Sequence, residues 1–277
     1  MNKMKKLTAL LLTFALLAVT PLSAMAASGT YIPTAGTRYE FKDGKWEIAS
    51  NIRFNYDKKG RLKSTRYENA DGGATISSLK WSGNYVTKST NTFESGRTYV
   101  TARKFKDGLL KTYTHTSPDS KSTYSYKWKK KKASVKFTVT PASASSLVSV
   151  AVKVNGKKQI ISETYKYSDG SAEKNEYKYF GNGNMKQYKR TDKHGITIQK
   201  FNKNGYITYF SSTYDGDVGT ETYKYTMDKK KKCPKEVTAE YKTSTGYSML
   251  SKTVYTSFKK VSDPRNCDAS GLAVGLM

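Results

Sequence analysis

Asp-Gly and Asn-Gly pairs recur along this chain, and they constrain its fold more than any other feature. Such pairs suit two-residue turns that need positive φ, and between alternating apolar residues they are the strongest short-range signal for a β-hairpin. Eight of them begin at Asp43, Asp71, Asp107, Asn155, Asp169, Asn182, Asn204 and Asp215. Their spread over most of the chain indicates a tandem repeat of hairpins and not one isolated turn.

Two kinds of turn alternate along the sequence. Hairpin tips are expected at Gly44, Gly60, Gly83, Gly108, Lys130, Gly156, Gly183, Gly205 and Lys230. Return turns are expected between them, at 71–73, 95–96, 117–119, 143–146, 169–170, 192–195, 215–219 and 244–246. We therefore predict an all-β fold, a long antiparallel meander of about nine or ten tandem hairpins whose single sheet curls into an open or closed shell.

Between the turns, aromatic and β-branched residues alternate with lysine and threonine, the period of a strand that is buried on one face. The 22 tyrosines supply much of that face. Around Lys130, the sequence predicts that two strands face each other through Tyr124, Tyr126 and Trp128 and through Val135, Phe137 and Val139. A further stripe of this kind consists of Val148, Val150, Val152 and Val154. Bulges are expected near Phe105 and Phe201, where apolar residues crowd both faces.

One unit carries a family resemblance. Its sequence, Tyr56-Asp57-Lys58-Lys59-Gly60-Arg61-Leu62 followed by Asp71-Gly72, resembles the YD repeat of RHS-type proteins. Other units, beginning at Phe105, Tyr179 and Phe201, keep the aromatic residue and the glycine but lose the Asp or the Arg. RHS repeats build large β-shells around a toxin domain, so the resemblance implies a meander of hairpins. It also implies an alternative function, that of a scaffold or shell partner for another secreted protein.

The first 26 residues read as a secretory signal peptide. Lys3, Lys5 and Lys6 precede an apolar run over 7–19, and Ala24-Met25-Ala26 offers the small residues of a cleavage site. Residues 27–277 are then expected to form a single repeat domain, whose weakest point is the small-residue stretch 141–146. We expect a bacterial protein that is secreted or associated with the cell wall, with no integral membrane segment after cleavage.

The charge of the chain points to an anionic partner. Its formal net charge is +27, and such a field attracts polyanions. For a secreted protein these include cell-wall polymers and acidic polysaccharides, and a protein partner is a further possibility. Nucleic acid is not expected, because the alternation separates basic from aromatic residues on opposite faces. The alternative interpretation is that lysine only keeps a β-rich surface soluble.

The candidate binding residues are two lysine clusters at hairpin tips and the tryptophans, which can stack on sugar rings. They are Lys127, Lys129, Lys130, Lys131, Lys132, Lys229, Lys230, Lys231, Lys232, Trp46, Trp81 and Trp128. Solvated loops that discourage edge pairing would give the same lysine clusters, and tryptophan also suits a core.

The two cysteines, Cys233 and Cys267, are predicted to form a disulfide, because secretion favours oxidation. Two reduced thiols are the alternative. This disulfide would connect the last segment to the hairpin at Lys230.

We expect no enzyme, no cofactor and no metal. His115 lies near Ser117 and Asp119, but neighbouring positions in sequence do not make a triad, and the chain has no G-x-S-x-G turn. A glycan-active enzyme remains a weaker alternative, since it needs two facing carboxylates. The acidic turn with Asp215, Asp217 and Glu221 favours an ordinary return turn over a calcium loop.

Overall fold

The computed structural model describes residues 30–83, 85–140 and 147–261. Within them the chain forms eighteen antiparallel strands in one sheet. The strands are β1 (Thr30–Lys42), β2 (Lys45–Tyr56), β3 (Leu62–Asn69), β4 (Ala74–Ser82), β5 (Tyr85–Thr92), β6 (Thr98–Lys106), β7 (Leu109–Thr116), β8 (Lys121–Lys129), β9 (Lys132–Thr140), β10 (Leu147–Val154), β11 (Ile160–Tyr167), β12 (Ala172–Tyr179), β13 (Met185–Asp192), β14 (Gly195–Phe201), β15 (Ile207–Tyr214), β16 (Asp217–Asp228), β17 (Cys233–Thr243) and β18 (Ser248–Val261).

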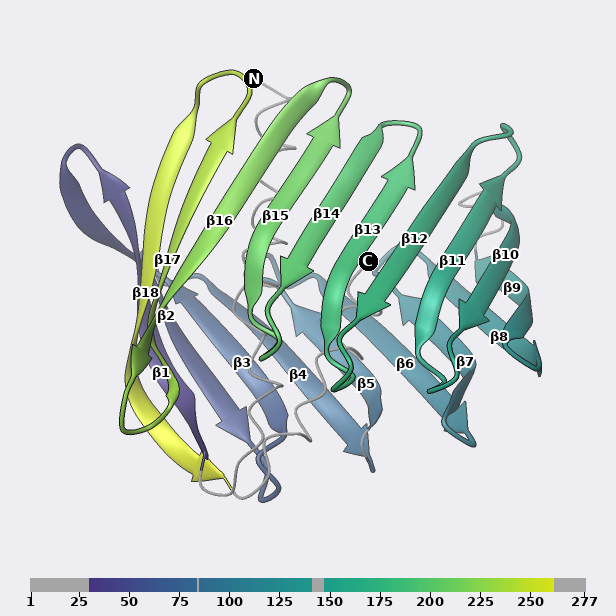
Figure 1. Cartoon of the computed structure of the whole chain (residues 1–277), viewed down its shortest axis with the longest axis horizontal. Helices are drawn as coiled ribbons and strands as arrows, with labels where there is room; N and C mark the ends of the chain where they lie inside the picture. Colours follow the sequence, from purple (N-terminus) through teal and green to yellow (C-terminus); the bar gives the residue numbers. More distant parts are fainter. Residues whose placement is uncertain (1–29, 84, 141–146, 262–277) are drawn as a thin grey trace.

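The sheet is closed. Each strand pairs with the next along the chain, and β9 joins β10 through pairs such as Val152 with Ala133. Strand β1 pairs with both β2 and β18, for example through Arg38 with Thr253. The barrel is flattened, with β10–β18 forming one wall and β2–β9 the other (Figure 1). The prediction of a curled hairpin meander is confirmed, and of its two forms the closed shell is the one observed.

The predicted turns within the described residues are confirmed. At three of them an aspartate and the following glycine both take positive φ, as in Asp43-Gly44 with 49° and 77°, which is the geometry of a type I′ hairpin turn. Lysine replaces glycine in this conformation at Lys130 and Lys232, each with a φ of 54°. The return turn expected over 215–219 is shorter than predicted, because β16 already begins at Asp217.

The side chains that point into the barrel are largely those that the alternation of the sequence predicted. Tyr124 lies opposite Phe137 and Tyr126 opposite Val135 across β8 and β9. Bulges interrupt the register beside Phe105 and Phe201, as predicted. The expectation for Val148 is wrong, because its side chain is 60% exposed. A register shift between Leu147 and Ser149 rotates it away from the interior, whereas Val150, Val152 and Val154 of the same stripe are buried.

Aromatic side chains complete the sheet near the hairpin tips. Trp81 Nε1 donates to the Leu62 carbonyl and Trp128 Nε1 to the Leu110 carbonyl, both at 2.7 Å. The hydroxyl groups of two tyrosines make the equivalent bonds, Tyr179 to Ile160 O at 2.8 Å and Tyr225 to Ile207 O at 2.7 Å. These donors lie on β4, β8, β12 and β16, so a unit of four strands is superimposed on the simple hairpin repeat. Each carbonyl lies beyond the end of the ladder between its own strand and the strand of its donor, where the aromatic group replaces a missing backbone partner.

Several predictions concern residues outside the described ranges. These are the signal peptide over 1–26, the possible boundary at 141–146 and Cys267, and the single-domain interpretation of 27–277 stays a prediction. Cys233, the other half of the predicted disulfide, is buried at the start of β17.

Candidate functional site

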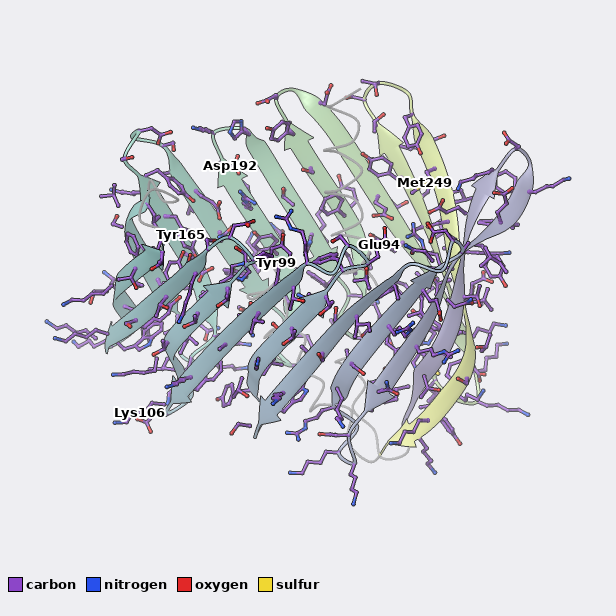
Figure 2. The ribbon with its side chains drawn as sticks, turned by 180° about the vertical axis from the view of Figure 1, so that it is seen from behind. Glu94, Tyr99, Lys106, Tyr165, Asp192 and Met249 are labelled. Carbon is purple, nitrogen blue, oxygen red and sulfur yellow. The ribbon has the colours of Figure 1, made fainter. Side chains whose placement is uncertain are left out.

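Lysine is segregated on the outward face of the barrel. On β12, Lys174 and Lys178 are exposed, whereas Asn175 and Tyr177 between them are buried. No lysine occurs among the buried residues of the described ranges. The same alternation runs around both walls, and long basic side chains such as Lys106 extend away from the molecule (Figure 2). The result is a positively charged outer surface around a mostly uncharged interior.

The first lysine cluster surrounds the turn between β8 and β9. Lys127 and Lys129 are the last outward positions of β8, and Lys132 opens β9 directly opposite Lys129. Lys130 and Lys131 form the turn between them. All five side chains belong to exposed residues. Like charges this close repel one another, so an anion bound among them would relieve that repulsion.

The second cluster, Lys229 to Lys232, is the turn between β16 and β17. The Asp228 carboxylate shapes it by accepting hydrogen bonds from the backbone N–H groups of Lys230 and Lys231, each at 2.9 Å. These bonds hold the pKa of Asp228 below its usual range. Lys231 Nζ lies 4.1 Å from the ring centroid of Phe258, so this lysine is partly committed to a cation–π contact. Figure 1 places the two clusters toward opposite ends of the long axis.

The three tryptophans do not form one surface. Trp81 and Trp128 are half-buried on the inward face, where they donate the hydrogen bonds described above. Trp46 lies near the β1–β2 turn. Its ring contacts Phe41 edge-on, with the ring centroids 5.2 Å apart, and Lys252 Nζ lies 4.3 Å from its centroid. Trp46 therefore lies beside a basic side chain, as does Trp81, whose ring centroid is 5.6 Å from Arg61 Cζ.

The interior holds charged groups that the sequence interpretation missed. Glu163 on β11 is buried, and its Oε2 accepts a 2.7 Å hydrogen bond from the Tyr177 hydroxyl on β12. Burial raises the pKa of Glu163 to about 7. Glu221 on β16 is also buried and accepts a 2.6 Å hydrogen bond from the Tyr223 hydroxyl. Burial raises the pKa of Glu221 as well.

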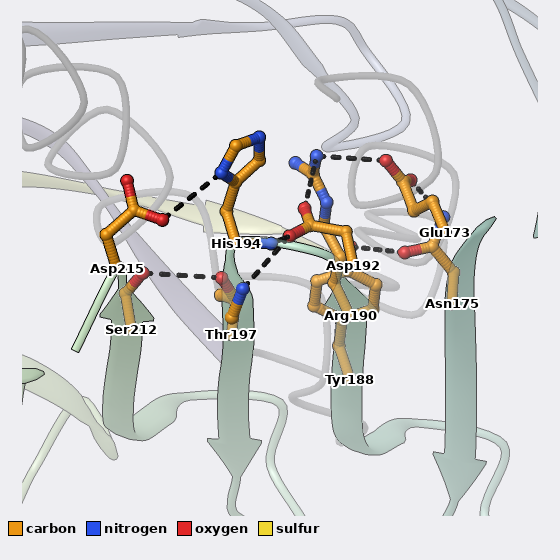
Figure 3. Close-up of polar contacts among 10 residues, drawn as sticks. Glu173, Asn175, Tyr188, Arg190, Asp192, His194, Thr197, Ser212 and Asp215 are labelled. Carbon is orange, nitrogen blue, oxygen red and sulfur yellow. Dashed lines mark hydrogen bonds and ion pairs between the residues drawn. The ribbon is translucent and has the colours of Figure 1, made fainter. Parts of the chain in front are cut away.

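A polar network lies toward the return turns of β12 to β15 (Figure 3). Arg190 Nη2 lies 2.9 Å from both Glu173 Oε2 and Asp192 Oδ2. Asn175 connects to this group by donating to Glu173 at 3.0 Å, and it accepts from the Tyr188 hydroxyl at 2.9 Å. One guanidinium faces two carboxylates, so Arg190 offsets the charge of only one of them.

The residues weighed for catalysis and metal binding do not assemble into a site. His115 Nδ1 lies 3.4 Å from Thr101 Oγ1, whereas Asp119 pairs with Arg97. Asp215 lies 3.3 Å from His194 Nδ1, while Glu221 points into the barrel. In the described part of the chain, no group of three or more potential metal ligands occurs.

A simple signal in the sequence could have located the inward charges. Glu163 is separated by an even number of residues from Tyr165 and Tyr167 on its strand, and the same holds for Glu173 and Tyr177. Because alternate residues of a strand share a face, a charged residue in step with the tyrosines belongs to the interior.

No protein-family model matches this chain, and no curated protein matches it. Among solved structures, it is similar to a porin-like protein from Bacteroides uniformis ATCC 8492, with a TM-score of 0.42 and 12% identity over 82% of this chain and 97% of the other. A porin-like protein from Bacteroides vulgatus ATCC 8482 gives a TM-score of 0.32 and 9% identity, over 81% and 99% of the two chains. Similarities of this size decide neither function nor location. Among the described residues, none belongs to a helix long and apolar enough to cross a membrane.

Proposed function

We propose that this chain is a secreted, non-enzymatic β-barrel that binds an anionic extracellular or cell-wall polymer through its outward lysines. The observation that carries the proposal is the segregation of charge, with lysines exposed on the outer face and none among the buried residues of the described ranges. Alternate residues of a strand are about 6.8 Å apart. A polymer with regularly spaced anionic groups would therefore meet several lysines along a single strand.

The polarity of the barrel favours a location in water. Barrels that face lipid carry an apolar band outward and polar residues inward. Here the order on β12 is the reverse, with Lys174 and Lys178 outward and Tyr177 buried. Placing such a lysine face against hydrocarbon would carry a large desolvation cost. This arrangement supports the proposal of a secreted or wall-associated protein.

The test is co-sedimentation of the 27–277 chain with purified bacterial cell walls across a salt series. The bound fraction should be high at low salt and fall as salt screens the charges. A chain that stays in the supernatant at low salt would refute polymer binding.

Two variants that each lose five positive charges test which part of the outer surface contacts the polymer. One replaces Lys127, Lys129, Lys130, Lys131 and Lys132 with glutamine. The control variant replaces five exposed lysines of the strands with glutamine, namely Lys80, Lys88, Lys104, Lys136 and Lys224. We expect the first variant to release at lower salt than the control, because its five charges are concentrated at one turn. Equal release from both variants would show that the whole face binds the polymer and that the cluster has no special role.

A further inference from the structure

Arg103 differs from the other inward arginines because the described residues give its guanidinium no ionic partner. It lies on β6, is 5% exposed, and stands opposite Tyr113 of β7 in the sheet register. Its Cζ lies 5.7 Å from the centroid of the Tyr113 ring. Thr101, two residues earlier on the same face, is also buried. Arg103 therefore belongs to the interior of the barrel and not to its basic outer surface.

Two nitrogens of Arg103, Nε and Nη1, are buried and have no hydrogen-bond partner in the described part of the chain. Arg190 Nε is also buried without a hydrogen-bond partner among the described residues, but the Arg190 guanidinium lies against two carboxylates, and Arg38 Nη2 lies 3.4 Å from Glu40. A buried charge without a partner is strongly destabilising, and a cation–π contact with a single ring satisfies neither N–H group. The guanidinium is thus a desolvated cation with free donors, the chemical complement of an anion.

We propose that Arg103 anchors a binding site for a small organic carboxylate on the inward face of the barrel. Guanidinium groups bind carboxylates and phosphates by charge-assisted hydrogen bonds. The surroundings favour the singly charged carboxylate. Tyr113 and Tyr126 interact electrostatically with both Arg103 and Glu163, so an acidic side chain lies just beyond them. A second negative charge on the ligand would lie in the buried interior without a second cation to pair with it, and Glu163, where ionised, would repel it.

The neighbouring side chains suit the rest of such a ligand. The rings of Tyr113 and Tyr126 are apolar surfaces, and the Thr101 hydroxyl is a further polar group on the same strand. Burial lowers the pKa of His115, which lies beside Thr101, so this imidazole is neutral near pH 7. Arg103 is then the principal positive charge of the site, and an aromatic carboxylate such as benzoate is the preferred class.

The distribution of polar residues indicates the side from which a ligand approaches. Toward the hairpin tips, Leu110, Tyr126, Ala133 and their neighbours form an apolar cluster. Toward the return turns, the inward positions of β6 and β7 are Tyr99, Thr101 and His115, which carry polar groups. An anion is therefore expected to reach Arg103 from the return-turn end.

The experiment measures thermal unfolding of the 27–277 chain with added sodium benzoate, against sodium chloride at equal ionic strength. Benzoate should raise the midpoint by roughly 5–10 °C when it exceeds its dissociation constant 100-fold. Arg103→Met should abolish this rise, whereas Arg53→Met, which removes an exposed arginine, should retain it. No rise in the unmodified chain, or an equal rise in Arg103→Met, would overturn the proposal. A rise with phosphate but not with benzoate or acetate would overturn the assignment to carboxylates.

A second measurement covers the case in which Arg103→Met does not fold. The arginine Nε–H resonances of the unmodified chain are followed by NMR during a benzoate titration. Saturable movement of one buried arginine resonance, retained in Arg53→Met, supports the site, and no movement overturns it. The lysine-to-glutamine variants should give the same titration as the unmodified chain, so failure of polymer binding and failure of this site are distinguishable.

Discussion

The Tyr177 hydroxyl and the Glu163 carboxylate form a buried hydrogen bond of 2.7 Å between neighbouring strands β12 and β11. Hydrogen bonds from Tyr177 and Tyr165 do not offset the desolvation of this carboxylate, and burial raises the pKa of Glu163 to about 7. The protein therefore stabilises this side chain best in its protonated form.

The first prediction concerns pH. The folded pKa of Glu163 lies above the unfolded value near 4.5, so folding favours proton uptake between these values. The stability contribution is complete below about pH 4.5 and is lost as pH rises through about 7, by up to roughly 3 kcal/mol. Denaturant unfolding of the unmodified chain and of Glu163→Gln from pH 5 to 8 should show this difference. His115, with a lowered pKa, has the opposite sign but is common to both proteins. Parallel stability curves would contradict the prediction.

The second prediction concerns the aromatic donors near the tips. Trp128→Phe keeps most of the ring but removes the Nε1–H that bonds the Leu110 carbonyl. Because that carbonyl would lose its partner, we expect a destabilisation of about 1–3 kcal/mol by denaturant unfolding. Trp46→Phe is the control, since the ring of Trp46 makes an edge contact and a cation–π contact instead. Equal effects of the two substitutions would argue against the bond.

The third prediction concerns a close backbone approach at the start of β14. A Cβ atom on Gly195 would overlap the carbonyl oxygen of Thr213 on β15, and the φ of Gly195 is 155°. Gly195→Ala should therefore destabilise the protein by more than about 2 kcal/mol. A Cβ on Gly181 would meet nothing within 4 Å, so Gly181→Ala should be nearly neutral. A thermal midpoint of Gly195→Ala equal to that of Gly181→Ala would show that the strands can separate to admit the methyl group.

The fourth prediction concerns the cysteines. The predicted Cys233–Cys267 bond should make the chain about 2 Da lighter than its reduced form and resistant to alkylation without reductant. Reduction should lower stability by roughly 2–4 kcal/mol. Cys233 is buried, so alkylation must be measured in denaturant. Two alkylated thiols under non-reducing, denaturing conditions would contradict the disulfide.

The local organisation of the fold could be predicted because it depends on local chemistry. Glycine after Asp or Asn marks the turns, and alternation alone predicts that the stripe of Tyr126 faces the stripe of Val135, as the strand register confirms. The prediction that Val148 faces inward is wrong for an equally local reason, because a register shift without a sequence signal turns its side chain outward. Closure of the sheet depends on the pairing of β1 with β18. These strands are far apart in the sequence, so no local sequence pattern predicts that they pair.

Of the candidate sites, some could be predicted from local sequence and others could not. Clustered lysines are visible in the sequence because turns expose them regardless of the global fold. The state of Arg103 is not visible, because it depends on which residues surround it across several strands. Alternation does place Arg103 on the same face as Tyr99 and Phe105, but only the structure shows that none of the described residues pairs with its Nε and Nη1.

Closure through β1 and β18 also has a consequence for the order of assembly. Side chains as far apart as Thr34 and Ser257 meet there, with their hydroxyl oxygens 2.8 Å apart. A chain that leaves the cell with its N-terminus first holds β1 as an open edge until the last strand has followed. Contacts of such long range slow folding, and unpaired edges recruit other chains. For a chain exported as proposed above, the sheet can be completed only after export of β18, and a chain that ends before β18 should aggregate more readily than the complete chain.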